Sequence, residues 1–262
     1  MSPIVALLSD FGMRDHYAGT MKGVILGICP EVTLVDITHD VPPHDVLTGA
    51  LQLAGAYRYF PAGTVFLAVV DPGVGSARRG LAAEAGDHKF VGPDNGVLSA
   101  VFREVPPRRL VELTERRFAR PTVSRTFEGR DRFAPAAAWL AKGIQLTALG
   151  RSIPDCVRLE IPSNEVSESS IRGAVVLVDR FGNLVTNIER RAFERFTAAG
   201  AVEIIAGEKR VPRLVGTYAE IGAGEVCALF GSTDHLELAA HAASAAEQLG
   251  LERGSVVTVR RA

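Results

Sequence analysis

TVFLAVVD, residues 64–71, is a continuous apolar run that closes on an aspartate. Two earlier runs, PIVALLSD (3–10) and VTLVDI (32–37), have the same character. The three are separated by stretches with helical spacing, HYAGTMKGVILGIC (16–29) and HDVLTGALQLAGAYRYF (44–60). Alternation of helices with strands that are apolar on both faces is typical of a parallel sheet covered on both sides. The sequence therefore predicts an N-terminal α/β domain with a mainly parallel sheet.

Each of these three strands is expected to end in an aspartate: Asp10, Asp36 and Asp71. In open α/β sheets, ligands bind beyond the carboxyl ends of the strands. A single aspartate at such a place is explained equally well as the cap of the following helix. Three of them in consecutive strands favour a binding site.

The polar stretch CVRLEIPSNEVSESS, residues 156–170, has no periodicity and is interpreted as containing a linker. After it the chain has short strand-like runs with close turns and one alanine-rich helix expected near residues 239–250. This texture predicts a small β-rich domain, a sandwich or a barrel. We therefore expect an α/β domain over 1–157, a linker over 158–170 and a smaller β-barrel-like domain over 171–262.

The composition narrows the class of protein. The 262 residues carry a formal net charge of −1, and no apolar run reaches the ~18 residues of a membrane span. Without a basic field, neither nucleic acid nor a membrane surface is an expected partner. The three cysteines, Cys29, Cys156 and Cys227, form no CxxC pair, which argues for a reducing compartment and against a zinc site. A soluble, cytoplasmic protein is expected.

The glycine-rich loop DPGVGSARRG, residues 71–80, follows the third strand. It lacks the Gly-Lys-Ser/Thr ending of a phosphate-binding loop and the glycine spacing of a dinucleotide fingerprint. Its glycines let the backbone pass close to a ligand. The loop also places Asp71 and Arg78 on opposite limbs of one turn, where they could pair. Such a pair has a structural or a functional role, and its place at a strand end keeps the functional one open.

The segment DITHDVPPHD, residues 36–45, concentrates aspartates and histidines. Its Pro-Pro dipeptide imposes an extended turn, and no HxH or HExxH spacing is present. We therefore expect no metal site there, and we expect Asp45 to cap the following helix.

The stretch VDRFGNLVTN, residues 178–187, is unusual for a hairpin because it joins a strand-end Asp179 to Phe181 and Asn183. Amide side chains pair with the edges of adenine, and aromatic rings stack on it. Small hydroxyl side chains, including Ser232, occupy the glycine-bounded turn in FGSTDHLELA, residues 230–239. The β-rich domain is therefore expected to contribute to a ligand site.

Seven motifs, taken together and in order, resemble one family closely: SDFGMRDHYAG, ITHDVPPHDV, VVDPGVGSARR, VGPDNGVLS, TFEGRDRFAP, VDRFGNLVTNI and GSTDHLELA. That family is the S-adenosylmethionine (SAM) hydroxide adenosyltransferases, or adenosine-forming SAM hydrolases, which are relatives of the SAM-dependent fluorinase and chlorinase. The resemblance implies an α/β domain followed by a β-barrel-like domain. It also implies a homotrimer that holds SAM between the N-terminal domain of one subunit and the C-terminal domain of the next.

The resemblance further implies a set of substrate-binding residues, each matched to one part of SAM. A carboxylate at Asp10 would accept hydrogen bonds from the ribose diol. The adenine edge would be read by Asn183, between the apolar walls of Phe181 and Tyr218. The methionine end would be bound by three further side chains: Asp15, Asp179 and Ser232.

The implied reaction is attack of water or hydroxide on the ribose C5′, which expels neutral methionine and yields adenosine. A sulfonium leaving group needs no general acid, so the protein has only to position and activate the nucleophile. SAM is the substrate, and no cofactor or metal is expected. Asp71 and Arg78 match the Asp and Arg that the hydrolases use for this task. Val74 stands where the halogenases carry a hydroxyl residue, and Gly129 stands where the fluorinase carries a serine, and both departures point away from halide chemistry.

One position departs from the family pattern. The usual run is Thr-Phe-His-Gly-Arg-Asp, and this chain reads TFEGRD, so Glu128 replaces the histidine that completes the catalytic triad. Glu128 could still act as the base for the water, with its charge balanced by Arg78. It could instead form a salt bridge with Arg78 that leaves the protein slow or altered in activity. A third interpretation is that the site has become a binder of SAM or adenosine. The sequence leaves all three open.

Overall fold

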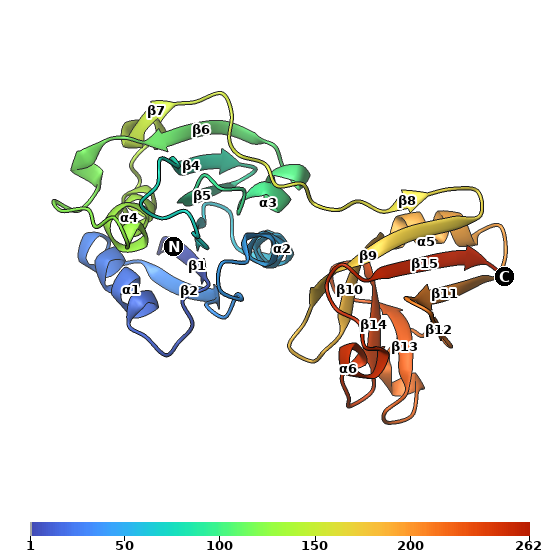
Figure 1. The fold of residues 1–262 in the computed structure, drawn as a ribbon. Helices are drawn as coiled ribbons and strands as arrows, with labels where there is room; N and C mark the ends of the chain where they lie inside the picture. The colour runs from blue at the N-terminus through green and yellow to red at the C-terminus, as the bar shows by residue number, and fades with distance from the viewer. Residues whose placement is uncertain (1) are drawn as a thin grey trace. The chain divides into compact units, whose positions relative to one another are not determined.

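The structure is a computed structural model that describes residues 2–262. The chain forms two compact units, one ending at Ile161 and the other beginning at Pro162 (Figure 1). The division lies within the segment 158–170 that the sequence predicts as a linker, although the later part of that segment already carries a short strand, β8 (Glu165–Val166), of the second unit. None of the helices in residues 2–262 is long and apolar enough to cross a membrane.

The first unit is built on one seven-stranded sheet. Its strand order is β2-β1-β3-β5-β4-β6-β7. The bounds are β1 Ile4–Ser9, β2 Thr33–Thr38, β3 Val65–Val69, β4 Gly80–Ala85, β5 His88–Pro93, β6 Pro107–Leu113 and β7 Gly150–Ser152. Strands β2, β1, β3 and β5 run parallel, whereas β4, β6 and β7 join by antiparallel pairing. The sheet is therefore mixed.

The antiparallel half of this sheet departs from the expected mainly parallel arrangement for a local reason. Only Gly86 and Asp87 separate β4 from β5, and Gly86 has a φ of 55°. A two-residue connection makes a tight hairpin, which forces antiparallel pairing. Parallel neighbours need a long connection, which passes through a helix between β1 and β2 and through the loop 70–79 and β4 between β3 and β5.

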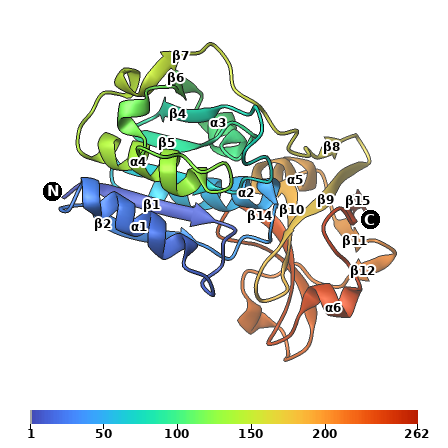
Figure 2. The same ribbon diagram turned by 60° about the vertical axis from the view of Figure 1, so that its left-hand side comes forward.

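Helices cover both faces of this sheet, as the apolar strands predicted (Figure 2). Helices α1 (Tyr17–Ile28) and α4 (Ala134–Ala141) pack on the face that includes Val5 and Leu7. Helices α2 (Val46–Ala56) and α3 (Ser99–Glu104) pack on the face that includes Ala6 and Leu8. Alternate residues of β1 thus enter separate cores, because successive side chains of a strand point to opposite faces.

Of the three aspartates predicted at strand ends, two lie at or just beyond the end of their strand and one does not. Asp10 directly follows β1, and Asp71 lies two residues beyond β3. The prediction for Asp36 is wrong, because β2 continues to Thr38 and Asp36 pairs with Leu7 inside the sheet. The hydrogen-bonded pairing of β2 with β1 continues to Thr38, beyond the end of the apolar run 32–37.

The second unit is an antiparallel, barrel-like β structure. Its strand order is β12-β11-β15-β9-β10-β14-β13, with β8 paired to β9. The bounds are β9 Ser170–Val178, β10 Leu184–Glu189, β11 Val202–Ala206, β12 Lys209–Val211, β13 Val226–Phe230, β14 His235–Ala240 and β15 Val256–Arg261. Its main core is a cluster of side chains such as Val175, Leu184, Leu238 and Val257, and a smaller second cluster comprises Ile221, Cys227, Leu229 and Ala239. Helix α5 (Arg190–Thr197) contributes Phe193 and Phe196 to that core.

The alanine-rich helix of this unit is shorter than the predicted 239–250. Ala239 and Ala240 belong to β14 and pair with β13, so the helix α6 covers only Ala245–Leu249. Ser244 caps its start by accepting a hydrogen bond from the Glu247 backbone N–H, and Gly250 ends it in the left-handed conformation. Alanine favours helices, but strand pairing overrides that preference here.

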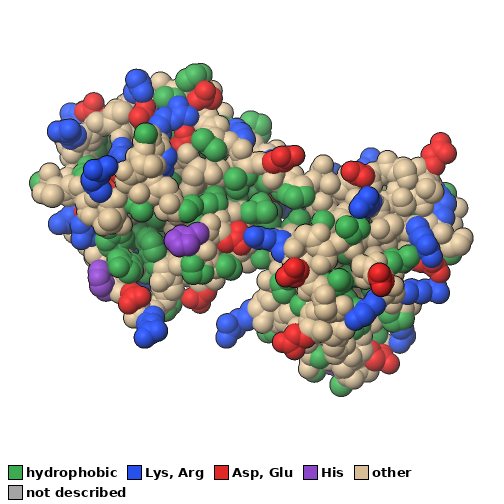
Figure 3. All heavy atoms as spheres, in the orientation of Figure 1, with side chains coloured by type: hydrophobic (Ala, Val, Ile, Leu, Met, Phe, Trp, Pro, Cys, Tyr) green, Lys and Arg blue, Asp and Glu red, His purple; other side chains and the backbone are tan. Residues whose placement is uncertain are grey.

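Shorter helical turns complete the two units. They are η1 Tyr57–Tyr59, η2 Arg116–Phe118, the π-helical η3 Gly129–Phe133, η4 Leu146–Leu149 and η5 Tyr218–Glu220. On the face drawn in Figure 3, acidic and basic side chains are interspersed, in keeping with the net charge of −1.

Candidate active site

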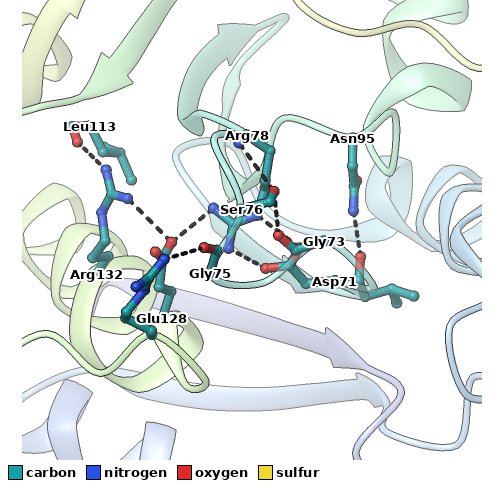
Figure 4. Close-up of polar contacts among 11 residues, drawn as sticks. Asp71, Gly73, Gly75, Ser76, Arg78, Asn95, Leu113, Glu128 and Arg132 are labelled. Atoms are coloured by element: carbon teal, nitrogen blue, oxygen red, sulfur yellow. Dashed lines mark hydrogen bonds and ion pairs between the residues drawn. The ribbon is translucent and has the colours of Figure 1, made fainter.

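The loop after β3 holds Asp71 and Arg78 together, as its sequence predicted. The Arg78 Nε donates to Asp71 Oδ1 at 2.8 Å, and its Nη2 donates to Asp71 Oδ2, so the pair is bidentate (Figure 4). Such paired charge-assisted hydrogen bonds fix both groups in one plane. Asn95 donates from Nδ2 to the Val70 carbonyl at 2.8 Å, which secures the chain just before Asp71.

Gly75 lets this loop turn tightly against its neighbour. The Ser76 N–H and hydroxyl both donate to the Gly73 carbonyl. Gly75 has a φ of 77°, and a Cβ there would collide with the carbonyl oxygen of Arg125. A larger residue at position 75 would therefore push apart the two segments that supply the polar cluster.

Glu128 joins the Asp71–Arg78 pair from a distant part of the chain. Arg78 Nη1 donates to Glu128 Oε2 at 2.8 Å, and Arg132 Nη1 donates to the same oxygen at 3.2 Å (Figure 4). The side chains of Asp71, Arg78 and Glu128 are only 7%, 9% and 11% exposed. These four residues, Asp71, Arg78, Glu128 and Arg132, are called the acid–arginine cluster below.

The cluster is electrostatically balanced, with two carboxylates and two guanidinium groups. Burial by itself would lower the pKa of Arg78, but the hydrogen bonds and negative charges of Asp71 and Glu128 outweigh it and raise the pKa. Arg78 therefore stays protonated. Its guanidinium also lies 5.2 Å from the centroid of the Phe133 ring, a cation–π contact.

The π-helical turn after Glu128 explains the density of charge in TFEGRDRFAP. Asp131 is fully buried and accepts from Arg130 Nε at 2.7 Å and from the Ser124 N–H at 2.9 Å. Burial would raise the pKa of Asp131, but the Arg130 and Ser124 hydrogen bonds outweigh it and lower the pKa. Arg130 and Asp131 thus stabilise this turn, while Glu128 and Arg132 serve the cluster. π-helical turns of this kind often occur at functional sites.

Asp10 is held at the end of β1 by a network that sequence reasoning missed. The Asp10 Oδ2 accepts from the His44 N–H at 2.8 Å. Buried beside it, Ser9 Oγ lies 2.7 Å from His39 Nδ1, and His39 Nε2 lies 3.1 Å from Asp36 Oδ1. Ser9 is fully buried, so this Ser–His–Asp chain positions the backbone around Asp10 and does not present a nucleophile. In the sequence, the only indication of this network is His39 within the run THD at 38–40.

The other site residues predicted in the first unit, Asp10 and Asp15, are not hydrogen-bonded to the acid–arginine cluster in the part of the chain that the structure describes. Asp15 is exposed in the loop before α1. Among residues 2–262, no hydrogen bond or ion pair joins Asp10 or Asp15 to the acid–arginine cluster. Asp45 caps α2 through the Thr48 N–H, as expected.

In the second unit, the hairpin after β9 and the turn η5 together bring an amide and two aromatic rings to one cavity of about 480 Å³. Its lining consists of Phe181, Asn183, Tyr218, Ala240, Ala242 and Ala243. Asp179 organises the turn by accepting from the Phe181 N–H, the Asn183 N–H and Asn183 Nδ2, at 2.8, 2.8 and 2.9 Å. The Phe181 ring is 77% exposed and free to stack on a ligand.

Two side chains near Asp179, those of Glu237 and Tyr218, have raised pKa values. Burial and the nearby Asp179 charge raise the pKa of Glu237, a buried residue that sequence reasoning did not single out. Burial, with the Glu237 and Asp179 charges, also raises the pKa of Tyr218. Ser232 lies exposed in the β13–β14 turn, outside the lining of the cavity.

Neither unit shows the features of a metal centre in its described part. No group of three or more His, Cys, Asp or Glu side chains within residues 2–262 is arranged to hold a metal ion. Cys29, Cys156 and Cys227 are free thiols.

A polar cluster at the carboxyl edge of an α/β sheet and an apolar cavity with a few polar groups are both typical of small-molecule sites. The sequence comparisons make the class specific. Residues 5–150 match the SAM hydroxide adenosyltransferase N-terminal domain, and residues 173–258 match the C-terminal domain of the same family. The chain belongs to this family.

Several relatives span nearly the whole chain. An (R)-S-adenosyl-L-methionine hydrolase from Thermus thermophilus is 41% identical over 97% of this chain and 98% of its own, and one from Salinispora tropica is 38% identical over 98% of both. A fluorinase from Actinoplanes sp. is 31% identical over 100% of this chain and 98% of its own. The crystal structure of an uncharacterized conserved protein from Thermotoga maritima superposes with a TM-score of 0.92 at 33% identity, covering 98% of this chain and 100% of the other.

Proposed function

We propose that this protein hydrolyses S-adenosyl-L-methionine to adenosine and L-methionine, by attack of water or hydroxide on the ribose C5′. The observation that carries the proposal is the buried acid–arginine cluster, in a chain of this family with 41% identity to a hydrolase of that name. The relatives' names specify the (R) configuration, and we propose the same sulfonium epimer as the substrate here.

The proposed chemistry needs one well-placed acceptor for the water. Both Asp71 oxygens accept from Arg78, whereas Glu128 binds both arginines through Oε2 alone. No hydrogen bond to Glu128 Oε1 is present among residues 2–262, so this oxygen is available to accept from the attacking water. As the new C5′–O bond forms, the C5′–S bond breaks and its electron pair goes to sulfur, which leaves as a neutral thioether. The proton of the water passes through Glu128 Oε1 to solvent.

Substrate recognition is proposed for the residues that the family resemblance assigned. Asp10 would bind the ribose diol, while Asp15, Asp179 and Ser232 would bind the methionine end. Asn183 would read adenine between Phe181 and Tyr218. The Asn183 Nδ2 is already held by Asp179, which leaves its Oδ1 to accept from the adenine amino group.

Further parts of the proposal concern the assembly and its surroundings. We propose a homotrimer in which the N-terminal domain of one subunit and the C-terminal domain of the next complete each SAM site. We also propose a cytoplasmic location and a reaction without cofactor or metal, because a cationic leaving group departs as a neutral molecule without Lewis-acid help. Light scattering during gel filtration tests the trimer, and activity measured with and without EDTA tests the independence from metal.

The decisive experiment incubates the purified protein with each sulfonium epimer of SAM and separates the products by chromatography. Adenosine and methionine in equal amounts, formed faster from the (R) epimer, are the expected result. The same incubation is repeated with chloride and with fluoride, to test the expectation from Val74 and Gly129 that this chain does not use halide. A halogenated nucleoside, or binding of SAM without turnover, would contradict the proposal. Asp71→Asn, which removes the charge of the loop carboxylate with little change in shape, is the matched low-activity control.

A further inference from the structure

The shared oxygen of Glu128 points to a role for Arg132. Two guanidinium groups donate to Glu128 Oε2, from Arg78 at 2.8 Å and from Arg132 at 3.2 Å. Arg132 follows Glu128 by four residues, so the turn of η3 brings the two side chains to the same side. Its Nη2 also donates to the Leu113 carbonyl at 2.6 Å, at the end of β6. Arg132 is therefore anchored to the sheet while it binds Glu128.

The charge of the cluster requires such a partner. Asp71, Arg78 and Glu128 alone would carry one excess negative charge on side chains that are at most 11% exposed. An uncompensated charge in such a place is costly, and it would also oppose formation of a hydroxide nearby. A neutral histidine at position 128 would leave Asp71 and Arg78 as a balanced pair. A glutamate at that position needs a second cation.

We propose that Arg132 is the positioning residue that makes Glu128 work in place of a histidine. It neutralises the added carboxylate and holds Oε2, so that Oε1 is left to orient the attacking water. This inference rests on the proposed SAM hydrolysis. It assigns Arg132 no contact with the substrate, and it predicts that Arg132 matters more when residue 128 is charged than when it is neutral.

Four proteins test this coupling: the wild type, Glu128→His, Arg132→Leu and the double variant. We measure kcat and KM for SAM hydrolysis of each. Arg132→Leu is expected to lower kcat about tenfold more in the Glu128 background than in the Glu128→His background. A merely structural arginine, needed for its bond to Leu113, would lower kcat by the same factor in both. Equal losses would overturn the proposal. Glu128→Gln provides a second uncharged background, judged by the same criterion if histidine reduces turnover too far to measure.

Two controls separate this effect from damage to the fold. Arg130→Leu removes a neighbouring arginine that binds Asp131 and not Glu128, and its effect on kcat should be the same in both backgrounds. Arg132→Lys restores the cation and should recover part of the lost kcat, and failure of this rescue in a folded protein would count against the proposal. Thermal unfolding identifies variants that do not fold. Absence of adenosine formation by the wild type would refute the proposed function itself, a result distinct from equal losses in a working enzyme.

Discussion

The acid–arginine cluster of the first unit and the cavity of the second unit hold their polar groups in opposite ways. In the cluster, buried charges satisfy one another across two distant segments, with Asp71 and Arg78 in the loop after β3 and Glu128 and Arg132 at η3. In the cavity, a single hairpin supplies Asp179, Phe181 and Asn183, and one ring is left largely exposed. A balanced charge cluster is suited to stabilising a reacting centre, whereas an open aromatic wall is suited to recognition. Substitutions in the first should therefore act on kcat, and those in the second on KM.

The largest effect is expected for Arg78→Ala. This change removes the guanidinium shared by both carboxylates and leaves two like charges around the nucleophile. We expect kcat to fall by about 1000-fold. Steady-state rates of adenosine formation give the answer. Arg79→Ala, which removes the adjacent arginine bound to Asp94 and Asp155, is the matched control and should cost far less activity.

A smaller loss is expected for Glu128→Ala, because the Asp71–Arg78 pair survives it. The acceptor for the water is lost, and kcat should fall by about 100-fold. Glu128→His should keep or raise the rate of hydrolysis, since it supplies a neutral acceptor of similar reach. If Glu128→His were inactive while Glu128→Ala ran at the wild-type rate, residue 128 would not lie beside the attacking water.

In the cavity, Phe181→Ala is expected to raise KM by about tenfold with little change in kcat, through the loss of stacking on adenine. The ring is exposed, so its removal should leave the melting temperature nearly unchanged. Val166→Ala removes another exposed apolar side chain, away from the cavity lining, and should change neither constant. If Phe181→Ala lowered kcat without changing KM, the assignment of catalysis to the cluster and of recognition to the cavity would be wrong.

The smallest effect concerns the pH dependence of stability. Burial and the Asp179 charge raise the pKa of Glu237 in the folded protein, so the folded state binds its proton more tightly than the unfolded state. Its contribution is therefore fully present below the unfolded pKa and is lost as the pH rises through the folded pKa. Glu237→Gln should raise the melting temperature relative to wild type more at pH 8 than at pH 4. A difference that is independent of pH would contradict this.

Predictions from the sequence succeeded where a short stretch carried all the information. The apolar runs indicated strands covered on both faces, and the turn 71–80 indicated the Asp71–Arg78 pair, because both depend on neighbours along the chain. The expectation failed for Asp36, where ladder pairing extends β2 past its apolar run. It failed again at Ala239 and Ala240, which pair with β13 against the preference of alanine for helices.

The sequence by itself determined the first three strands with the helices between them, the loop that pairs Asp71 with Arg78, and the hairpin that presents Phe181 and Asn183. These follow from periodicity and turn chemistry, which act over a few residues. Only the tertiary structure decided that Arg78 reaches Glu128 across 50 positions in the chain. It also decided that Arg132 binds the same oxygen while anchored to Leu113 of β6, and that Glu237 is buried near Asp179. Such contacts join residues that are far apart in the chain. They depend on how the sheet and the helices pack against one another, which periodicity and turn chemistry do not specify.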